Sequence, residues 1–224
     1  MITKEKMASL IDQTLLKPDA TKHDIRKLCY EAINYGFWSV CVNPSYVSLA
    51  ARILRNTKLK VCSVVSFPLG ANTPEVKAFE AKKAIMDGAN EIDMVINLGA
   101  FKSGDFELVK QDMAYVVNTC VQLQRDVIVK VIIETGLLSY KEKTLACQLV
   151  KNSGANFVKT STGLNTRGAT VQDVKFIRKL VGPEFGVKAS GGIRTYRDAL
   201  KLIKAGANRI GTSSGTSIIK GISA

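Results

Sequence analysis

The chain has 224 residues, of which 46% are hydrophobic, and its formal net charge is +13. This length and composition suffice for one hydrophobic core, so we expect residues 1–224 to form a single domain. The opening residues, MITKEKMASL, lack the apolar region of a signal peptide, and no run of 18 apolar residues follows them. We therefore expect a cytoplasmic protein without a membrane partner.

The positive charge raises the possibility of a nucleic-acid partner, because phosphate backbones select basic surfaces. The lysines, however, are spread through segments such as TKHDIRK and EVKAFEAKKA, mostly beside acids at helical spacing. No basic run is interleaved with aromatic residues, so solvated helix faces are favoured. A nucleic-acid-binding protein remains a remote alternative.

The five cysteines are spaced without a CxxC motif: Cys29, Cys41, Cys62, Cys120 and Cys147. This pattern argues against a zinc site and against a disulfide framework. We expect reduced thiols.

Short apolar runs alternate with longer amphipathic segments, which predicts parallel strands joined by crossover helices. The predicted strands span residues 10–14, 39–43, 60–67, 91–97, 127–135, 157–162, 186–190 and 209–213. Eight strand–helix units in this length predict an α/β fold, a single-domain (β/α)8 TIM barrel. An open doubly wound sheet is the alternative, but it needs a glycine-rich turn after the first strand, and IDQTLLKPD contains no glycine.

Several residues indicate where the helices begin and end. Thr21 with Asp24 predicts a capping box, and Thr73 before Pro74 predicts an N-cap followed by the first helical residue. Three glycines are expected at helix C-termini: Gly88, Gly154 and Gly206.

A short repeat relates the even-numbered strands. The triplet GAN occurs at 88–90, 154–156 and 206–208, each time before a predicted strand, and Gly36 holds the comparable place before the second strand. The residues five positions after these glycines are Cys41, Asp93, Lys159 and Gly211. Because alternate strands of a barrel supply one interior layer, we expect these four positions to face inward at one level.

Lys159 interrupts an otherwise apolar strand, and an isolated lysine of this kind could simply extend to the rim. Lys130 and Lys188 interrupt the two neighbouring strands in the same way. Three buried cations are hard to explain by packing, since each uncompensated one costs several kcal/mol. A neighbouring ammonium can instead lower the pKa of one amine, leaving it neutral and nucleophilic, as Schiff-base chemistry on a carbonyl requires.

Two glycine-rich loops, SGGIR at 190–194 and GTSSG at 211–215, follow the seventh and eighth predicted strands. In barrels these loops often bind phosphate through backbone N–H groups, hydroxyls and an arginine. Ordinary turn chemistry could explain either loop alone, but together they predict a phosphorylated ligand. The expected phosphate-binding residues are Gly191, Gly192, Ile193, Arg194, Gly211, Ser213 and Ser214.

A set of segments, in order along the chain, resembles the deoxyribose-phosphate aldolases, class I aldolases on a (β/α)8 barrel. These segments are IDQTLLKPDAT, VCVNP, EIDMVIN, KVIIETG, FVKTSTG, VKASGGIR and GTSSG. The resemblance implies reversible cleavage of 2-deoxy-D-ribose 5-phosphate to D-glyceraldehyde 3-phosphate and acetaldehyde, within deoxyribonucleotide catabolism. It also implies a homo-oligomer, dimer or tetramer, that uses no cofactor and no metal. His23 is the only histidine, which fits lysine chemistry better than a metal-dependent aldolase.

By position in these motifs, the resemblance implies that Lys159 forms the Schiff base, that Lys188 depresses its pKa, and that Asp93 acts as acid and base through water. It also adds Gly163 to the phosphate site.

The resemblance assigns less direct roles to three further residues. Asp12 would orient the lysine cluster or a substrate hydroxyl, although an Asp that starts a turn is an equal alternative. Lys130 would pair with carboxylates. Cys41 matches a pocket cysteine of the family, with a buried inert thiol as the default.

Two departures from the family pattern concern proton transfer. Gln13 stands where many members have His, and the printed sequence ends in IIKGISA without the tyrosine-bearing tail of some members. Among enzymes, a transaldolase-like transferase or a phosphate-binding isomerase remains an alternative, and release of free acetaldehyde would distinguish the aldolase from both.

Overall fold

Eight parallel strands pair in sequence order, and the last strand pairs with the first, so the sheet closes on itself. The computed structural model describes residues 2–123 and 126–222. The strands are β1 Ile11–Leu15, β2 Ser39–Val42, β3 Lys60–Val65, β4 Glu91–Val95, β5 Ile128–Ile132, β6 Phe157–Lys159, β7 Gly186–Ser190 and β8 Arg209–Thr212. This closed ring confirms the predicted (β/α)8 barrel and excludes the open sheet.

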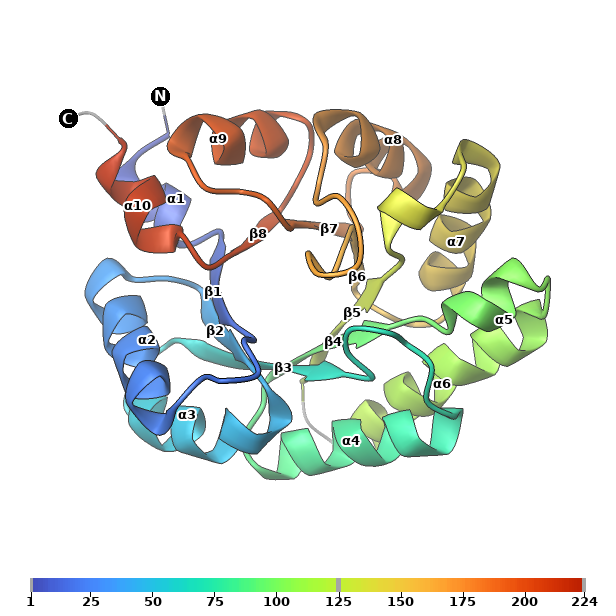
Figure 1. The fold of residues 1–224 in the computed structure, drawn as a ribbon, viewed down its shortest axis with the longest axis horizontal. Helices are drawn as coiled ribbons and strands as arrows, with labels where there is room; N and C mark the ends of the chain where they lie inside the picture. Colours follow the sequence, from blue (N-terminus) through green and yellow to red (C-terminus); the bar gives the residue numbers. More distant parts are fainter. Residues whose placement is uncertain (1, 124–125, 223–224) are drawn as a thin grey trace.

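The helices form an outer ring around the strands, as Figure 1 shows in a view down the barrel. They are α1 Lys4–Ala8, α2 Lys22–Tyr35, α3 Val47–Leu54, α4 Pro74–Met86, α5 Leu98–Lys102, α6 Phe106–Gln122, α7 Tyr140–Asn152, α8 Val171–Val181, α9 Tyr196–Lys204 and α10 Gly215–Lys220, with the 3-10 turns η1 Pro44–Tyr46 and η2 Thr135–Leu137. None of the helices in residues 2–123 or 126–222 combines the length and the apolar character needed to cross a membrane.

The helices begin and end at the residues that the capping signals predicted. The reciprocal hydrogen bonds of the Thr21–Asp24 capping box are both present at the start of α2. Thr73 and Pro74 begin α4, although the Thr73 side chain makes no capping hydrogen bond. The three predicted C-terminal glycines have positive φ directly beyond their helices: Gly88, Gly154 and Gly206.

All eight predicted strands exist, but β5 and β6 end three residues earlier than predicted. Glu134 has φ +51, a left-handed conformation that takes the chain out of the strand. The residues beyond the strands stay buried, because Thr135 N–H donates to the Thr160 carbonyl (2.8 Å) and Thr160 N–H donates to the Lys188 carbonyl (3.0 Å). The apolar runs therefore continue into loops at the mouth of the barrel.

The asparagine of each GAN triplet joins its own strand to the preceding one. Its side-chain oxygen accepts a hydrogen bond from a backbone N–H at the start of β3, β5 or β7: Val61 to Asn90 (3.0 Å), Val129 to Asn156 (2.8 Å) and Val187 to Asn208 (3.0 Å). The backbone N–H of each asparagine returns a bond to the same residue's carbonyl. The repeat thus fixes the register between three pairs of strands.

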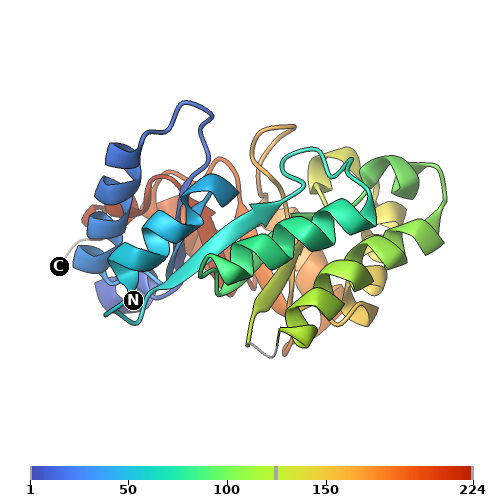
Figure 2. The ribbon, with the colours of Figure 1, turned by 90° about the horizontal axis from the view of Figure 1, so that it is seen from below.

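The main hydrophobic core lies between the outer face of the barrel and the helices, while the interior holds a small second cluster. Cys41, Cys62 and Val64 form this inner cluster, and Leu16 and Phe67 pack against it. The barrel interior is otherwise polar and charged, as the site below shows. Loops after β1, β3 and β6 rise at one end of the barrel, at the top of Figure 2.

We expect Asn156→Ala to lower the free energy of unfolding by about 1 kcal/mol, because Val129 N–H loses its side-chain acceptor. Chemical denaturation measures this change. Asn152→Ala, at the exposed end of α7, is the matched control and should stay within about 0.5 kcal/mol of the parent protein. Equal stability of both variants would contradict a role of the triplet in holding the register.

Candidate active site

Side chains from alternate strands fill the barrel interior in layers of four, as is usual for this fold. The predicted layer of Cys41, Asp93, Lys159 and Gly211 is present. Ligand atoms of Cys41 and Asp93 lie within 4.8 Å of one another, and Lys159 Nζ lies 2.8 Å from Asp93 Oδ2. A Cβ added at Gly211 would lie 2.9 Å from Lys188 Cε, so this position must be a glycine to leave room for the lysine.

The layer from the odd-numbered strands consists of Asp12, Cys62, Lys130 and Lys188, whose side chains contact the predicted layer or one another. A third layer comes from the even-numbered strands two residues earlier: Ser39, Glu91, Phe157 and Arg209. Seven of these residues are joined by ion pairs, and we call them the charge network: Asp12, Glu91, Asp93, Lys130, Lys159, Lys188 and Arg209.

Asp93 is the centre of the charge network, because its carboxylate contacts three lysines. Its Oδ1 accepts from Lys130 Nζ at 2.8 Å, and its Oδ2 accepts from both Lys159 Nζ (2.8 Å) and Lys188 Nζ (2.7 Å). Lys159 and Lys188 therefore share one oxygen atom. Their two amines lie next to each other deep in the barrel.

The other two carboxylates hold the remaining cations. Asp12 lies 2.5 Å from Lys188 Nζ and 2.9 Å from Arg209, and it also accepts from the Ser39 hydroxyl at 2.7 Å. Glu91 lies 2.6 Å from Lys130 Nζ and 3.3 Å from Arg209. Of the two readings of Asp12 from sequence, the structure supports the one in which it orients the lysine cluster.

The lysines of the charge network keep Asp93 ionised. Burial alone would raise the pKa of Asp93, but the charges of Lys130, Lys159 and Lys188 outweigh burial and hold the pKa well below its ordinary value. Burial would likewise lower the pKa of Lys188, yet Asp12 and Asp93 raise it above the ordinary lysine value. The pKa of Lys130 is raised against burial in the same way, chiefly by Asp93. Lys130 and Lys188 therefore remain ammonium groups at neutral pH.

A cavity of about 350 Å³ lies at the mouth of the barrel, above the charge network. Its wall consists of Thr14–Pro18, Phe67, Lys159, Thr162–Leu164, Ser190–Arg194 and Gly211–Ser213. Of the seven residues of the charge network, Lys159 alone lines this cavity. Lys159 Nζ also lies 5.8 Å from the centre of the Phe67 ring. A ligand in the cavity would thus meet one amine of the charge network, with Asp93 and the other lysines of the network behind it.

Seven of the eight sequence-predicted phosphate residues line the cavity: Gly163, Gly191, Gly192, Ile193, Arg194, Gly211 and Ser213. Ser214 is not part of the wall and instead directly precedes α10. Ile193 is buried, while Arg194 is exposed. Thr212 joins the two loops by donating to the Ile193 carbonyl (2.6 Å) and accepting from Ser214 N–H (2.9 Å).

Two glycines let the loops after β6 and β7 meet backbone to backbone. Gly163 and Gly191 have φ of +83° and +89°, which favours glycine. A Cβ added to Gly163 would lie 3.1 Å from the Gly191 Cα, and one added to Gly191 would lie 3.0 Å from the Gly163 Cα. Side chains at these positions would push the two walls of the cavity apart.

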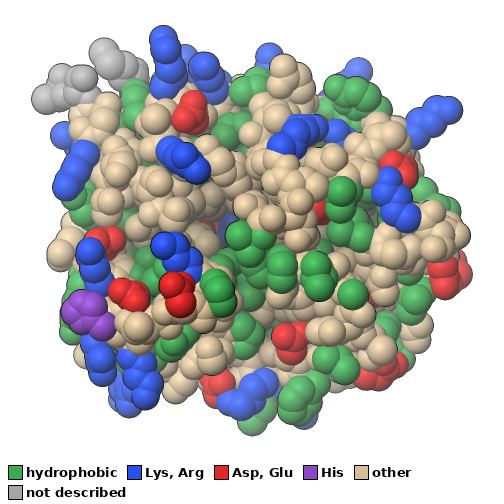
Figure 3. Space-filling view, viewed as in Figure 1, with side chains coloured by type: hydrophobic (Ala, Val, Ile, Leu, Met, Phe, Trp, Pro, Cys, Tyr) green, Lys and Arg blue, Asp and Glu red, His purple; other side chains and the backbone are tan. Residues whose placement is uncertain are grey.

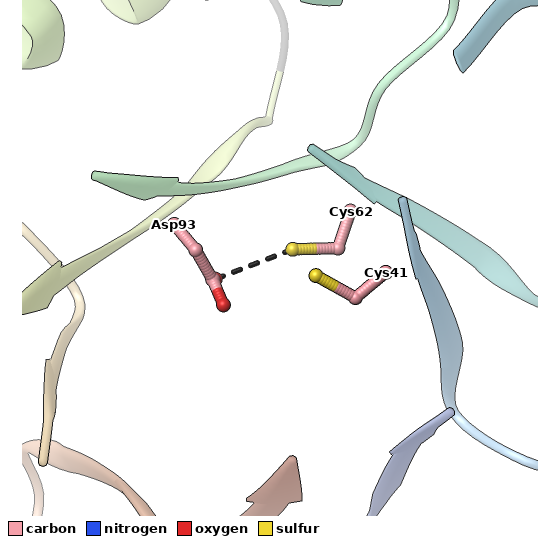
Figure 4. A group of neighbouring side chains, drawn as sticks. All are labelled: Cys41, Cys62 and Asp93. Carbon is pink, nitrogen blue, oxygen red and sulfur yellow. Dashed lines mark hydrogen bonds between the residues drawn. The ribbon is translucent and has the colours of Figure 1, made fainter. Parts of the chain in front are cut away.

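Cys41 and Cys62 are buried side by side on β2 and β3, as Figure 4 shows with Asp93. The Cys62 thiol donates to Asp93 Oδ1 at 3.2 Å, and burial raises the pKa of this thiol well above its ordinary value. Cys41, Cys62 and Asp93 form a cluster of donor types that metals use. Because three lysines already contact Asp93 and Cys62 is a neutral thiol, these contacts favour a hydrogen-bonded cluster over a metal site.

The sequence interpretation missed Glu91 and Arg209. The Arg209 guanidinium lies 4.3 Å from the Trp38 ring centre and 5.6 Å from that of Phe157, and Trp38 Nε1 donates to Glu91 at 2.6 Å. The sequence does contain a signal for them, because counting back two residues from each member of the predicted layer reaches the next layer of the barrel. That count arrives at both Glu91 and Arg209.

Gln13 lies outside the charge network. Its side-chain oxygen accepts from the backbone N–H of Gly215, at 3.0 Å, at the first residue of α10. Side chains alternate along a strand, so Gln13 points outward where Asp12 points inward. The departure from His at this position therefore concerns the placement of the loop after β8, and not a contact with Lys159.

Surface charge is mixed on the face seen in Figure 3, where Lys and Arg side chains lie around the rim with Asp and Glu between them. This distribution agrees with the sequence interpretation of solvated helix faces. Electrostatic attraction of an anionic small molecule is a general consequence of the net charge of +13.

Comparison with known proteins identifies the family. The model for the DeoC/LacD family of aldolases matches residues 6–221. This chain belongs to the DeoC/LacD aldolase family. The chain is 61% identical over 222 residues to deoxyribose-phosphate aldolase of Thermococcus kodakarensis, which covers 98% of both chains, and 58% identical over 216 residues to that of Streptococcus gordonii, which covers 96% of both. The family membership identifies an aldolase, and thus a lyase.

Solved structures of family members share the barrel. The deoxyribose-phosphate aldolase of Aeropyrum pernix matches with a TM-score of 0.90 and 38% identity, covering 97% of this chain and 91% of that one. An aldolase named QR15 also matches with a TM-score of 0.90, at 41% identity, covering 96% of this chain and 94% of its own.

We expect Asp93→Asn to lower the free energy of unfolding at pH 7 by about 3–5 kcal/mol, because three buried lysines lose the carboxylate that they share. The depressed pKa of Asp93 means that its stabilisation is complete above the unfolded-state pKa, near 4, and is lost as the pH falls toward the folded-state pKa. The difference between parent and variant should therefore be smaller by about 1 kcal/mol at pH 3. Urea denaturation at both pH values measures this, and a difference that is the same at pH 7 and pH 3 would contradict it.

Proposed function

We propose that this chain is a class I aldolase that reversibly cleaves 2-deoxy-D-ribose 5-phosphate to D-glyceraldehyde 3-phosphate and acetaldehyde through a Schiff base on Lys159. The single observation that carries the assignment of the nucleophile is that Lys159 alone, among the residues of the charge network, lines the cavity. The substrate follows from relatives at 61% and 58% identity that are named deoxyribose-phosphate aldolase.

The charge balance of the network distinguishes Lys159 from the other lysines. Four cations face three carboxylates, which leaves one buried positive charge in excess when all are ionised. Lys130 and Lys188 each contact two carboxylates, whereas Lys159 contacts one and shares its oxygen with Lys188. Lys159 is therefore the cation with the fewest counter-charges, and Schiff-base formation requires its amine in the neutral form.

In the proposed reaction, neutral Lys159 attacks C1 of the open-chain aldehyde, and loss of water from the carbinolamine gives an iminium ion. Asp93 is the candidate for moving protons at this step, through water, and its carboxylate lies where it also stabilises the positive iminium. The iminium withdraws electrons as the C3 hydroxyl loses its proton and the C2–C3 bond breaks. Glyceraldehyde 3-phosphate leaves, and the remaining enamine takes up a proton and is hydrolysed to acetaldehyde and Lys159.

The phosphate group of the substrate would bind at the loops after β6, β7 and β8. Gly163, Gly191, Gly192 and Ser213 line the cavity there, and backbone N–H groups of such loops bind phosphate oxygens. Arg194 adds a positive charge at the exposed edge of the same wall. The rest of the wall includes Leu16 and Phe67, whose apolar side chains suit the unsubstituted C2 methylene of a deoxy sugar.

Assembly and location are parts of the same proposal. The A. pernix relative is described as having a tetrameric structure, which supports a homo-oligomer here. Exposed apolar side chains on α4, namely Val76, Phe79 and Met86, fit burial against another subunit. A cytoplasmic location and a role in deoxyribonucleotide catabolism remain predictions from the sequence.

Reduction with borohydride in the presence of 2-deoxyribose 5-phosphate should leave a covalent label on Lys159, because it is the one amine of the charge network that a ligand in the cavity can reach. Peptide mass spectrometry locates the label. Lys159→Arg, which keeps a cation but cannot form the imine, is the control and should remain unlabelled. A label on Lys130 or Lys188 in the parent protein would overturn the assignment.

Ser213→Asp should lower kcat/KM for 2-deoxyribose 5-phosphate by at least about tenfold, because a carboxylate would face the phosphate dianion. Cleavage of unphosphorylated 2-deoxyribose should change little, so the ratio of the two kcat/KM values isolates phosphate binding from damage to the lysine chemistry. Ser213→Ala should have only a small effect, since backbone amides carry most of the recognition. An unaltered ratio in a folded Ser213→Asp protein would mean that the phosphate binds elsewhere.

A further inference from the structure

Glu134 is a buried carboxylate that the chemistry above does not use. It follows β5 by two residues, is fully buried, and adopts φ +51° and ψ +66°. Ser66, which directly follows β3, is the other residue besides glycine with positive φ in the described parts of the chain. A left-handed backbone is unfavourable for glutamate and persists only where its surroundings hold it in place. The contacts of its carboxylate show what holds it.

The Glu134 carboxylate binds the loop after β6. Its Oε2 accepts from the Thr162 hydroxyl at 2.6 Å and from Thr162 N–H at 3.2 Å, and its Oε1 accepts from the Thr166 hydroxyl at 3.3 Å. No lysine or arginine in residues 2–123 and 126–222 forms an ion pair with it. A buried carboxylate held by neutral donors is suited to fixing a loop in one position.

Thr162 passes this constraint on to the cavity wall. The Thr162 hydroxyl donates its hydrogen to Glu134. Its oxygen also accepts from Leu164 N–H (3.2 Å) and Asn165 N–H (3.4 Å), and these bonds close a tight turn. Thr162, Gly163 and Leu164 line the cavity, and Lys159 lies three residues before Thr162. The Asn165 side chain donates to the Pro68 carbonyl at 2.8 Å, which links the turn to the loop that carries Phe67.

The segment around this turn is closely packed on two sides. A Cβ added at Gly136, two residues after Glu134, would lie 2.2 Å from the Thr166 hydroxyl oxygen. On its other side, the turn meets the loop after β7 through the close approach of Gly163 and Gly191. The loops after β5, β6 and β7 therefore fit together as one wall, with the Glu134 carboxylate at the joint between the first two.

We propose that Glu134 is a positioning residue that fixes the turn at residues 162–165 and thereby sets the affinity of the cavity for a phosphorylated sugar. This inference rests on the proposed function, because the turn carries Gly163, one of the residues assigned to the phosphate. Glu134 touches neither Lys159 nor Asp93 in the described hydrogen bonds, so the lysine chemistry is separate from its role.

Glu134→Ala removes every carboxylate contact to the turn. We expect kcat/KM for 2-deoxyribose 5-phosphate to fall by about tenfold or more, mainly through a higher KM, while the value for unphosphorylated 2-deoxyribose changes by less than about threefold. Trapping of acetaldehyde on Lys159 with borohydride should persist. Glu142→Ala, which removes a glutamate from the exposed N-terminus of α7, is the matched control and should leave both sugars unaffected.

Glu134→Gln tests whether hydrogen bonding or charge is responsible. A glutamine can turn its carbonyl oxygen toward Thr162 and its amide toward the Thr166 hydroxyl, so it should recover most of the lost selectivity for the phosphorylated sugar. A carboxylate acting as an acid or base would not be replaced in this way. Failure of Glu134→Gln to recover any selectivity would overturn a positioning role.

Thr162→Val removes the hydroxyl that donates the shortest of these hydrogen bonds to Glu134, and it tests the inference even if Glu134→Ala does not fold. It should raise KM for the phosphorylated sugar in the same direction, and in a folded double variant the two effects should combine to less than their product. Equal loss for the two sugars, or no loss for either, would contradict the inference. Ser213→Asp, measured in parallel, separates failure of the phosphate site from failure of the role of Glu134. If Ser213→Asp leaves the ratio of kcat/KM for the two sugars unaltered, the phosphate site itself is wrong. If Ser213→Asp alters this ratio but Glu134→Ala and Thr162→Val do not, only the role of Glu134 is wrong.

Discussion

The carboxylate of Asp93, buried at the centre of the barrel and shared by three lysines, is the interaction on which the rest of the site depends. Without it, the buried cations of the interior would have too few counter-charges to offset their desolvation. With it, Lys130 and Lys188 are fixed as cations below the cavity, and Lys159 is brought to the cavity floor. One carboxylate thus stabilises the fold and arranges the candidate chemistry at the same time.

The barrel geometry explains why such a cluster can form and why it faces a cavity. Alternate strands supply successive interior layers, so charged residues distant in sequence become neighbours in the middle of the molecule. The inner apolar cluster of Cys41, Cys62 and Val64 fills one side, and the charge network fills the other. The loops at the carboxyl ends of the strands then enclose the space above Lys159, joined by Glu134, Thr212 and the contact of Gly163 with Gly191.

Much of this arrangement could be predicted from the sequence because equivalent positions recur at a fixed offset from a repeated motif. The GAN triplet marks equivalent positions in three αβ turns, and a fixed offset from it reaches Asp93 and Lys159. Glu91 and Arg209 lie two residues before Asp93 and Gly211, so an offset of three residues from the same glycines reaches the next layer of the barrel. Ser214 belongs to the same loop motif as Ser213, but it is the residue before α10 and is not part of the cavity wall, and its phosphate role stays a prediction.

Other features depend on register and loop packing, which no local pattern encodes. Cys41 and Cys62 read as scattered thiols, and only the pairing of β2 with β3 places them side by side. The apolar runs predicted β5 and β6 to be longer, since burial looks the same in a strand and in a packed loop. The left-handed conformation of Glu134 and its hydrogen bond to Thr162, 28 residues away, depend on how the two loops pack, so no local sequence pattern predicts them.

The most direct test of the central claim is a crystal structure of the protein after borohydride reduction with 2-deoxyribose 5-phosphate. The account predicts a single covalent adduct on Lys159 Nζ, with Asp93 still bridging Lys130 and Lys188 beneath it and with the phosphate against the loops after β6, β7 and β8. An adduct on Lys159 in which Asp93 has left both lysines would contradict the claim that its shared carboxylate organises the site. So would a phosphate bound at the opposite wall, beside the loop after β3.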